Sequence, residues 1–457
     1  MKNARDLFSF NLREKPLLPA TLINILVVCF IEMFILSKGI DIPTSLSISI
    51  FAVTQAIILY AVYTNADIYI ALSITTLYTL GLNIQFLLIT DSDILTFQSC
   101  FEETMVAMIL GLCCAAALLF ISKKLLSCFS QKQVQWCLVA ILFITIAMAG
   151  VLYLFPATHG THSWLKLGSF QFQLTELHKP LFIVYAALLF NSSMNKKAIW
   201  SCAYILFAVL SLGICGELGT ALIIVISWII VNFIFIDDKK EVLFAIGSIV
   251  SAGGLGFGIL ALAAKISSSS QNAPKIIDFM ASQFNKVLGR IQDVSDLEPG
   301  SQAMLGYRAI IRGGWLGNEE IIHIPEERYD YTFCALLLRM GIVFGIVVIL
   351  LFGLMIWRSV RIYEYSDKHN SSLNNKMAFS SAVVIFVSAM ISICGNTRAL
   401  PLTGVVLPFI ASGASAGLVN WLMFTLVIYN TRNKVPKLSV EKQPEANNNN
   451  IKVDTHR

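Results

Sequence analysis

The ionisable residues whose types and spacing could support chemistry gather in two polar stretches, 156–180 and 265–330, within an otherwise apolar chain. Connecting segments of this kind are where binding residues concentrate. Asp330 ends the second stretch at the edge of an apolar segment, where partly apolar surroundings can raise a carboxyl pKa and suit it to general-base catalysis. The same position would also suit an Asp that caps a helix N-terminus or favours its dipole.

Other charges in the second stretch suit the binding of anions or of a metal. Arg308 and Arg312 are four residues apart, so a short helix would place both guanidinium groups on one side, where they could bind a phosphate. Anionic lipid headgroups would attract the same pair. Glu326 and Glu327 could support a divalent cation or an acceptor sugar, or could be solvated loop charges. No other cofactor is indicated.

The first stretch contains three further candidates, and a fourth, Glu217, lies farther along the chain. Lys179 lies at the start of an apolar segment, where the helix dipole disfavours a cation, so a nearby anion or Glu176 is expected as its partner. Trp164 alone would fit an interfacial belt residue. Glu217 lies within an apolar run, which favours a functional role, although an ion pair that fixes helix packing would also explain it.

The elements that must position these residues are membrane helices. Only 13% of the 457 residues are charged and 56% are apolar, with a mean hydropathy of +0.73. A soluble domain has about 25% charged residues, so this composition excludes an ordinary water-facing surface. The net charge of +5 therefore reflects membrane topology and does not indicate nucleic-acid binding.

Apolar runs near the length of about 20 residues that spans a bilayer recur along the chain. They lie near 18–36, 45–63, 68–90, 104–122, 136–155, 180–195, 198–215, 219–236, 242–264, 331–357, 377–395 and 405–429. The sequence thus predicts an all-α polytopic bundle of about twelve spans.

Basic residues predict the orientation of this bundle, because cytoplasmic loops keep most of the positive charge. With residues 1–17 in the cytoplasm, the pairs Lys123/Lys124 and Lys239/Lys240 also fall inside. Both termini are therefore expected to be cytoplasmic, and 156–180 and 265–330 extracytoplasmic. The tail 430–457 is polar and is expected to be disordered.

Several blocks resemble the SEDS family of polytopic peptidoglycan polymerases, the RodA/FtsW/SpoVE type. HSWLKLGSFQFQLTELHK is similar to the family pattern G-A-x-R-W-I-x-L-G-x-F-x-F-Q-P-S-E-x-x-K, and GELGTAL to D-L-G-T-A-L. LGYRAIIRGGWLG followed by IPEERYDYTF resembles a glycine-rich loop running into L-P-E-x-H-T-D-F-I-F. ALPLTGVVLPFIASGASAG resembles L-P-x-T-G-x-x-L-P-F-x-S-Y-G-G-S-S. The blocks occur in family order from about residue 156 to 420.

Departures from the family pattern are also clear. Ser163 stands where the family has Arg, Leu174 and Thr175 replace Pro-Ser, Glu217 replaces Asp, and Leu338 and Arg339 stand where a paired carboxylate is usual. Five apolar segments precede Trp164 where the family has three. The resemblance thus implies a core over 156–429 after N-terminal segments 18–155, which include two additional spans.

The resemblance implies a glycosyltransferase of the bacterial cytoplasmic membrane that polymerises lipid II on the outer face, in elongation, division or sporulation. Asp330 matches the family's catalytic Asp and is the expected general base. Substrate contacts are expected from the other candidates in the matching blocks, namely Trp164, Glu176, Lys179, Glu217, Arg308, Arg312 and Glu326. The usual family partner is a single-pass transpeptidase, a class B penicillin-binding protein.

Two other functions remain open from the sequence. A flippase for a lipid-linked sugar would use Glu217 and Arg339 along its substrate path. A catalytically silent scaffold would bind the transpeptidase without polymerising anything.

Overall fold

The computed structural model describes residues 17–89, 94–124, 128–157, 161–167, 170–269, 274–293, 301–320, 322–370 and 372–432. The predicted cytoplasmic N-terminus and nearly all of the predicted disordered tail lie outside these residues. The described chain is almost entirely helical, which confirms the all-α fold.

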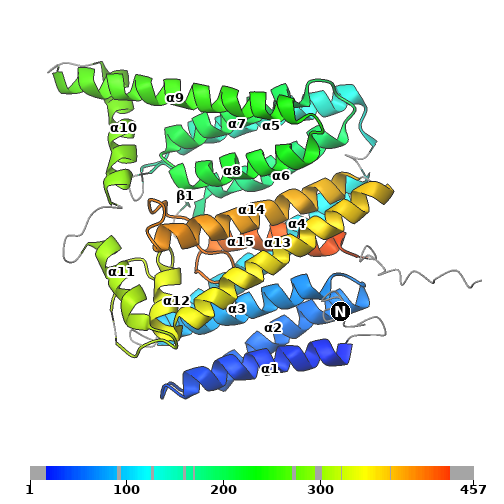
Figure 1. Cartoon of the computed structure of the whole chain (residues 1–457), viewed down its shortest axis with the longest axis vertical. Helices are drawn as coiled ribbons and strands as arrows, with labels where there is room; N and C mark the ends of the chain where they lie inside the picture. Colours follow the sequence, from blue (N-terminus) through cyan, green and yellow to red (C-terminus); the bar gives the residue numbers. More distant parts are fainter. Residues whose placement is uncertain are drawn as a thin grey trace, which may run out of the picture.

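Most helices run side by side along one direction (Figure 1). Within the described part, ten of them are long and apolar enough to cross a membrane. They are α1 (Leu17–Leu36), α2 (Thr44–Tyr63), α3 (Ile68–Ile89), α4 (Ile94–Lys124), α5 (Gln131–Leu152), α7 (Lys197–Cys215), α8 (Leu218–Phe235), α9 (Lys239–Ser269), α13 (Ile342–Asn370) and α14 (Leu373–Asn396). Two shorter helices, α6 (His178–Asn191) and α15 (Ala414–Asn430), fill the remaining expected spans.

Two of the predicted apolar segments differ in detail from the structure. The run 331–357 is broken into α12 (Thr332–Met340) and α13 by Gly341, whose φ of +92° belongs to the left-handed region that favours glycine. A Cβ on Gly341 would lie 2.3 Å from the Trp315 carbonyl oxygen, so the backbone approach also requires glycine. The run 405–429 becomes helical only at Ala414, and 401–413 is a loop.

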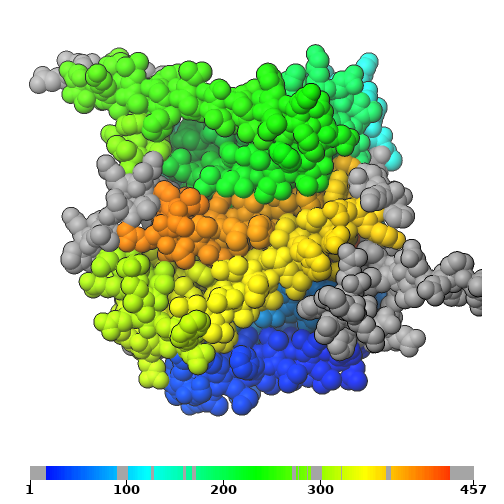
Figure 2. All heavy atoms as spheres, in the orientation of Figure 1, coloured from blue at the N-terminus to red at the C-terminus, as the bar shows by residue number. Residues whose placement is uncertain are grey.

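The remaining elements gather at the end of the bundle opposite the N label (Figure 1). A two-stranded antiparallel hairpin, β1 (Trp164–Leu167) and β2 (Phe170–Gln173), pairs Trp164 with Gln173. It leads through the 3-10 helix η2 (Leu174–Leu177) into α6. The stretch 265–330 contains α10 (Lys275–Asp293) and α11 (Gln302–Gly313). Figure 2 shows the α11–α12 segment at this end, between α14 and the α1–α2 pair.

Helices α3 and α14 form the centre of the bundle, with 89% and 83% of their membrane-length windows buried, whereas α9 is only 11% buried. Gly81 on α3 allows a very close approach of the 409–410 backbone, since a Cβ there would lie 2.4 Å from the Phe409 carbonyl oxygen. Small residues permit this kind of contact inside a membrane bundle. Helix α3 thus packs directly against the loop that precedes α15.

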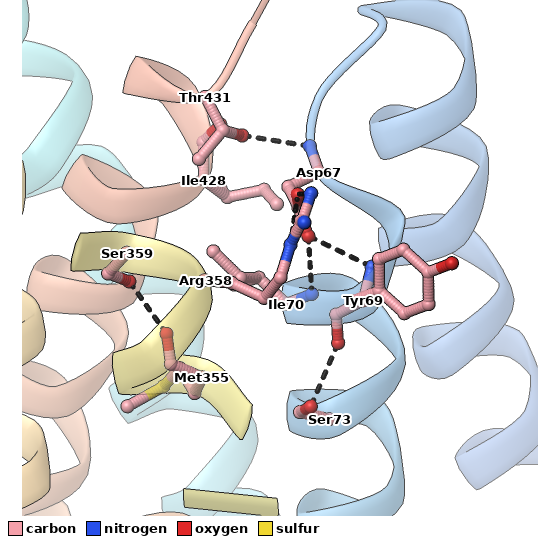
Figure 3. Close-up of polar contacts among 9 residues, drawn as sticks. All are labelled: Asp67, Tyr69, Ile70, Ser73, Met355, Arg358, Ser359, Ile428 and Thr431. Atoms are coloured by element: carbon pink, nitrogen blue, oxygen red, sulfur yellow. Dashed lines mark hydrogen bonds and ion pairs between the residues drawn. The ribbon is translucent and has the colours of Figure 1, made fainter. Parts of the chain in front are cut away.

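At the other end of the bundle a buried ion pair joins α3, α13 and the end of α15 (Figure 3). Arg358 of α13 donates from Nε to Oδ2 of Asp67 at 3.0 Å, and its Nη2 contacts the same oxygen. Asp67 Oδ1 accepts from the backbone N–H groups of Tyr69 and Ile70, each at 3.0 Å, and the Thr431 hydroxyl accepts from the Asp67 N–H. Asp67 is 1% exposed, so this cluster fixes the start of α3 and the end of α15 against α13 within the protein.

Candidate functional site

Asp330 lies half-buried immediately before α12, and its backbone is held by a residue of α14. Nδ2 of Asn396 donates to the Asp330 carbonyl at 2.7 Å and to the Ser392 carbonyl at 2.9 Å. Oδ1 of Asn396 accepts from the Cys334 N–H at 3.1 Å. Tyr331 occupies the N-cap position of α12, and Asp330 directly precedes it.

The Asp330 carboxylate faces the loop that contains Gly404. A Cβ on Gly404 would lie 3.5 Å from Asp330 Oδ2, and the φ of this glycine is +71°. On the other side of the loop, a Cβ on Gly219 would lie only 2.6 Å from the Thr403 carbonyl oxygen. The loop 403–405 therefore lies between Asp330 and the first turn of α8, where Glu217 holds the N-cap position.

The hairpin reaches the same region from the other side. Nε2 of Gln173 donates to Glu217 Oε1 at 3.3 Å, and the Gln173 N–H donates to the Ser415 hydroxyl at 2.9 Å. The Ser412 N–H, three residues before Ser415, donates to the Arg328 carbonyl at 2.9 Å. The segment 412–415 thus joins the hairpin to the turn that ends at Asp330. The four sequence blocks converge at one end of the bundle.

Glu176 and Lys179 form a buried ion pair between η2 and α6. Lys179 Nζ donates to both carboxylate oxygens of Glu176, at 3.0 and 2.7 Å, and the side chains are only 3% and 7% exposed. This confirms Glu176 as the partner of Lys179. Both charges are satisfied inside the protein, so any effect of the pair on a substrate would be exerted through the position of the hairpin.

Arg308 and Arg312 lie on one side of α11, as their spacing predicted, and both are exposed. The other side of α11 packs on α12 through the glycines at 306 and 313 and through Ala309. Nη1 of Arg312 lies 3.6 Å from Oε2 of Glu320. The two arginines thus face away from the α11–α12 contact.

Residues 323–329 line an open cavity of about 380 Å³ at the surface, next to Asp330 in the chain. Glu326 has a φ of +60°, a strained conformation for a residue with a side chain, and such strain tends to persist at functional sites. Oε2 of Glu327 accepts from the Ile324 N–H at 3.3 Å, and His323 Nδ1 lies 3.8 Å from its Oε1. Burial raises the pKa of Glu327, an effect that the hydrogen bond from the Ile324 N–H and the nearby His323 partly offset.

A divalent cation remains a prediction. The described residues include no group of three or more His, Cys, Asp and Glu side chains placed to hold a metal ion. Glu326 and Glu327 are the adjacent carboxylates on the cavity wall, and they would be the first ligands to test.

Some of these contacts could not be assigned from the sequence. Three residues position other groups through hydrogen bonds without having been predicted to do so, namely Asn396, Gln173 and Ser415. Of these, only Asn396 could have been noticed in the sequence, as an amide at the end of an apolar run. Chemically, the site presents a carboxylate on a fixed backbone, next to a glycine loop and a cavity. This arrangement suits proton abstraction from a hydroxyl group of a substrate that lies against the loop.

The sequence blocks at this end of the bundle lie within a match to a known protein family. The model of the FtsW/RodA/SpoVE family, described as "Cell cycle protein", matches residues 65–435 and leaves α1 and α2 outside. The probable peptidoglycan glycosyltransferase FtsW of Saccharophagus degradans is 26% identical over 284 residues, which cover 59% of this chain and 68% of that protein. Stage V sporulation protein E of Bacillus subtilis is 24% identical over 282 residues, covering 58% and 71%.

Solved structures share the fold. A chain from "Structural coordination of polymerization and crosslinking by a peptidoglycan synthase complex" superposes with a TM-score of 0.57 at 18% identity, covering 81% of this chain and 99% of that chain. Rod shape determining protein RodA of Thermus thermophilus gives a TM-score of 0.52 at 17% identity, covering 81% and 98%. At these identities the likeness supports the fold alone.

Proposed function

Because this chain belongs to the FtsW/RodA/SpoVE family of cell cycle proteins, we propose that it is a peptidoglycan glycosyltransferase. Its relatives include proteins named for this activity and for sporulation. The substrate we propose is lipid II, an undecaprenyl-pyrophosphate disaccharide-peptide. The chain is a polytopic membrane protein, and we place it in the bacterial cytoplasmic membrane with both termini inside and the Asp330 end of the bundle outside.

The observation on which this proposal chiefly rests is the setting of Asp330. Its main chain is fixed by Asn396, and its carboxylate lies against Gly404 of the 399–417 block. In the reaction, the acceptor sugar hydroxyl forms a bond to C1 of the donor sugar, and the C1–oxygen bond to the pyrophosphate breaks. The pyrophosphate leaves with the bonding electrons, and the hydroxyl proton passes to Asp330.

Substrate contacts are proposed from residues around this carboxylate. Glu326 lines the adjacent cavity, and Glu217 is linked through Gln173 to the hairpin that contains Trp164. Glu176 and Lys179 would hold the hairpin and α6 in position. Arg308 and Arg312 are placed on the exposed side of α11, where a phosphate or an anionic headgroup could reach them.

The partner we propose is a single-pass transpeptidase, a class B penicillin-binding protein. The similar solved structure comes from a peptidoglycan synthase complex that couples polymerisation to crosslinking, which supports a partner of this kind.

The experiment that tests this function is polymerisation of purified lipid II by the purified full chain, alone and with its transpeptidase, read as glycan strands on a gel. A polymerase produces strands of many disaccharides. A flippase would instead move labelled lipid II across liposomes and leave it unpolymerised. A silent scaffold would do neither, while still binding the transpeptidase.

A further inference from the structure

The turn before α12 contains a cation, Arg328, that the fold leaves without a counter-charge. Its Nε is buried and has no hydrogen-bond partner, and Arg328 forms no ion pair within the described ranges. Its guanidinium carbon lies 5.8 Å from the centroid of the Tyr329 ring. A buried donor without a partner is costly, and in a native structure it calls for an explanation such as a ligand.

The backbone of Arg328 is held in place from two sides. Its carbonyl accepts from the Ser412 N–H at 2.9 Å and from Nε2 of Gln85 at 3.1 Å. Gln85 lies on the central helix α3 and is only 4% exposed. The main chain of Arg328 is therefore fixed at the wall of the cavity, which Glu326 and Glu327 also line.

The adjacent carboxylate does not neutralise Arg328, because Glu327 binds elsewhere. Its two oxygens face the Ile324 N–H and His323. Asp330 follows two residues later and faces Gly404. The turn thus presents a cation and a carboxylate in succession, which are the two charges that a displacement of pyrophosphate by a hydroxyl requires.

The hairpin keeps a half-buried lysine, Lys166 of β1, but it differs from the family pattern at Ser163. The family pattern has Arg where this chain has Ser163, and Ser163 is fully buried with its hydroxyl bonded to Thr161. Lys179 is paired with Glu176 and is 3% exposed. At the position of Arg328 the family pattern has His. One basic residue is therefore absent from the hairpin, and a permanent cation is present on the Asp330 turn.

We propose that Arg328 binds the pyrophosphate of the polyprenyl-linked substrate. This inference rests on the proposed function and adds a residue to it. The planar guanidinium suits two-point contact with a phosphate, and its fixed position would stabilise the charge that develops on the leaving group.

The test is equilibrium binding of undecaprenyl pyrophosphate to the full chain in nanodiscs, in an Asp330→Asn background so that no turnover occurs. Undecaprenol, which has the same chain without phosphate, is the ligand control. Arg328→Gln is expected to raise the Kd for undecaprenyl pyrophosphate by about tenfold or more and to leave the Kd for undecaprenol unchanged, since charge-assisted hydrogen bonds are lost. Arg328→Lys should restore part of the affinity.

Two further variants make the outcome decisive. Arg361→Gln changes an exposed arginine on α13 and should bind like the parent. Arg328→His, measured at pH 8 where most of the imidazole is neutral, provides a second loss of charge in a side chain that the family accommodates, should Arg328→Gln not fold. Parent-like affinity for undecaprenyl pyrophosphate in a folded Arg328→Gln or Arg328→His variant would overturn the inference.

The test separates this inference from the proposed function. If the unmutated chain polymerises lipid II while the Arg328 variants bind pyrophosphate normally, the function stands and the inference fails. If the chain polymerises nothing yet its pyrophosphate affinity depends on Arg328, the inference stands as a phosphate site and the glycosyltransferase proposal fails.

Discussion

Asn396 on α14 donates a 2.7 Å hydrogen bond to the main-chain carbonyl of Asp330 and at the same time accepts from the Cys334 N–H of α12. One buried amide therefore fixes both the proposed base and the first turn of the helix after it. Asn396 is a positioning residue in this account, because it reaches substrate only through Asp330.

Asn396→Leu removes these hydrogen bonds while keeping the size of the side chain. We expect kcat for lipid II polymerisation to fall about tenfold or more with little change in KM, because misplacing a base by a fraction of an ångström slows the chemical step. Asn232→Leu is the matched control. Asn232 is equally buried and hydrogen-bonded, but it lies near the C-terminal end of α8, whereas the candidate site lies at the N-terminal end. Both variants should lose stability by about 1–3 kcal/mol, and only Asn396→Leu should lose kcat. Equal kcat in the two variants would show that Asn396 serves packing alone.

The Asp67–Arg358 pair makes a separate prediction about stability. Arg358→Gln leaves the nearly inaccessible Asp67 without its cation, and breaking a buried pair costs about 3–5 kcal/mol. Arg361→Gln, three residues along the same helix, disrupts an exposed pair with Glu364 and should cost less than about 1 kcal/mol. Thermal unfolding in detergent, followed by tryptophan fluorescence, compares them. Similar melting temperatures for the two variants would contradict a stabilising role for Asp67.

Glu327 gives a prediction about pH. Burial raises the pKa of this carboxyl above its ordinary value of 4.5, so the folded protein retains the proton to higher pH than the unfolded chain does. Its contribution to stability is fully present below the unfolded pKa and is lost as the pH rises through the folded pKa. The melting temperature of Glu327→Gln relative to wild type should therefore increase as the pH rises from about 4.5 to neutrality. Glu364→Gln, at an exposed site, should show no such trend. A constant difference for Glu327→Gln would indicate an unshifted carboxyl.

The orientation of the bundle can be tested by cysteine labelling. In a variant without the ten native cysteines, a membrane-impermeant maleimide added outside intact cells should modify a cysteine at position 268 and spare one at position 448. Lysed cells should allow both to react. Labelling at 448 alone in intact cells would place the Asp330 turn on the cytoplasmic side and remove the proposed outer site.

Much of the fold could be predicted because the bilayer imposes a length and a composition on every span. The break at Gly341 could not be predicted, because hydropathy is continuous across 331–357. Its cause is a backbone contact with Trp315, which lies well before Gly341 in the sequence. The loop before Ala414 could not be predicted either, because its sequence is as apolar as that of a helix. Apolar character alone does not distinguish a helix from an extended segment buried between helices.

The site could be predicted to a different extent at each residue. The Lys179–Glu176 pair followed from the helix dipole, and the structure contains it. The helical spacing of Arg308 and Arg312 was right, but their exposure depends on which side of α11 packs against α12, and that is a tertiary property. Nothing in the sequence pointed to Arg328, because an arginine in a polar turn is common. That Arg328 lacks a counter-charge becomes visible only when the partners of the neighbouring residues are known.

The most direct test of the central claim is the rate of lipid II polymerisation by purified Asp330→Asn with its transpeptidase, measured beside wild type and beside Glu364→Gln, a change at an exposed carboxylate. Asn keeps the size of the side chain and most of its hydrogen bonds but cannot accept the hydroxyl proton. We predict a loss of about 100-fold or more with an unchanged elution profile and melting temperature, and no loss in Glu364→Gln. Polymerisation by Asp330→Asn at the wild-type rate would contradict the assignment of Asp330 as the base.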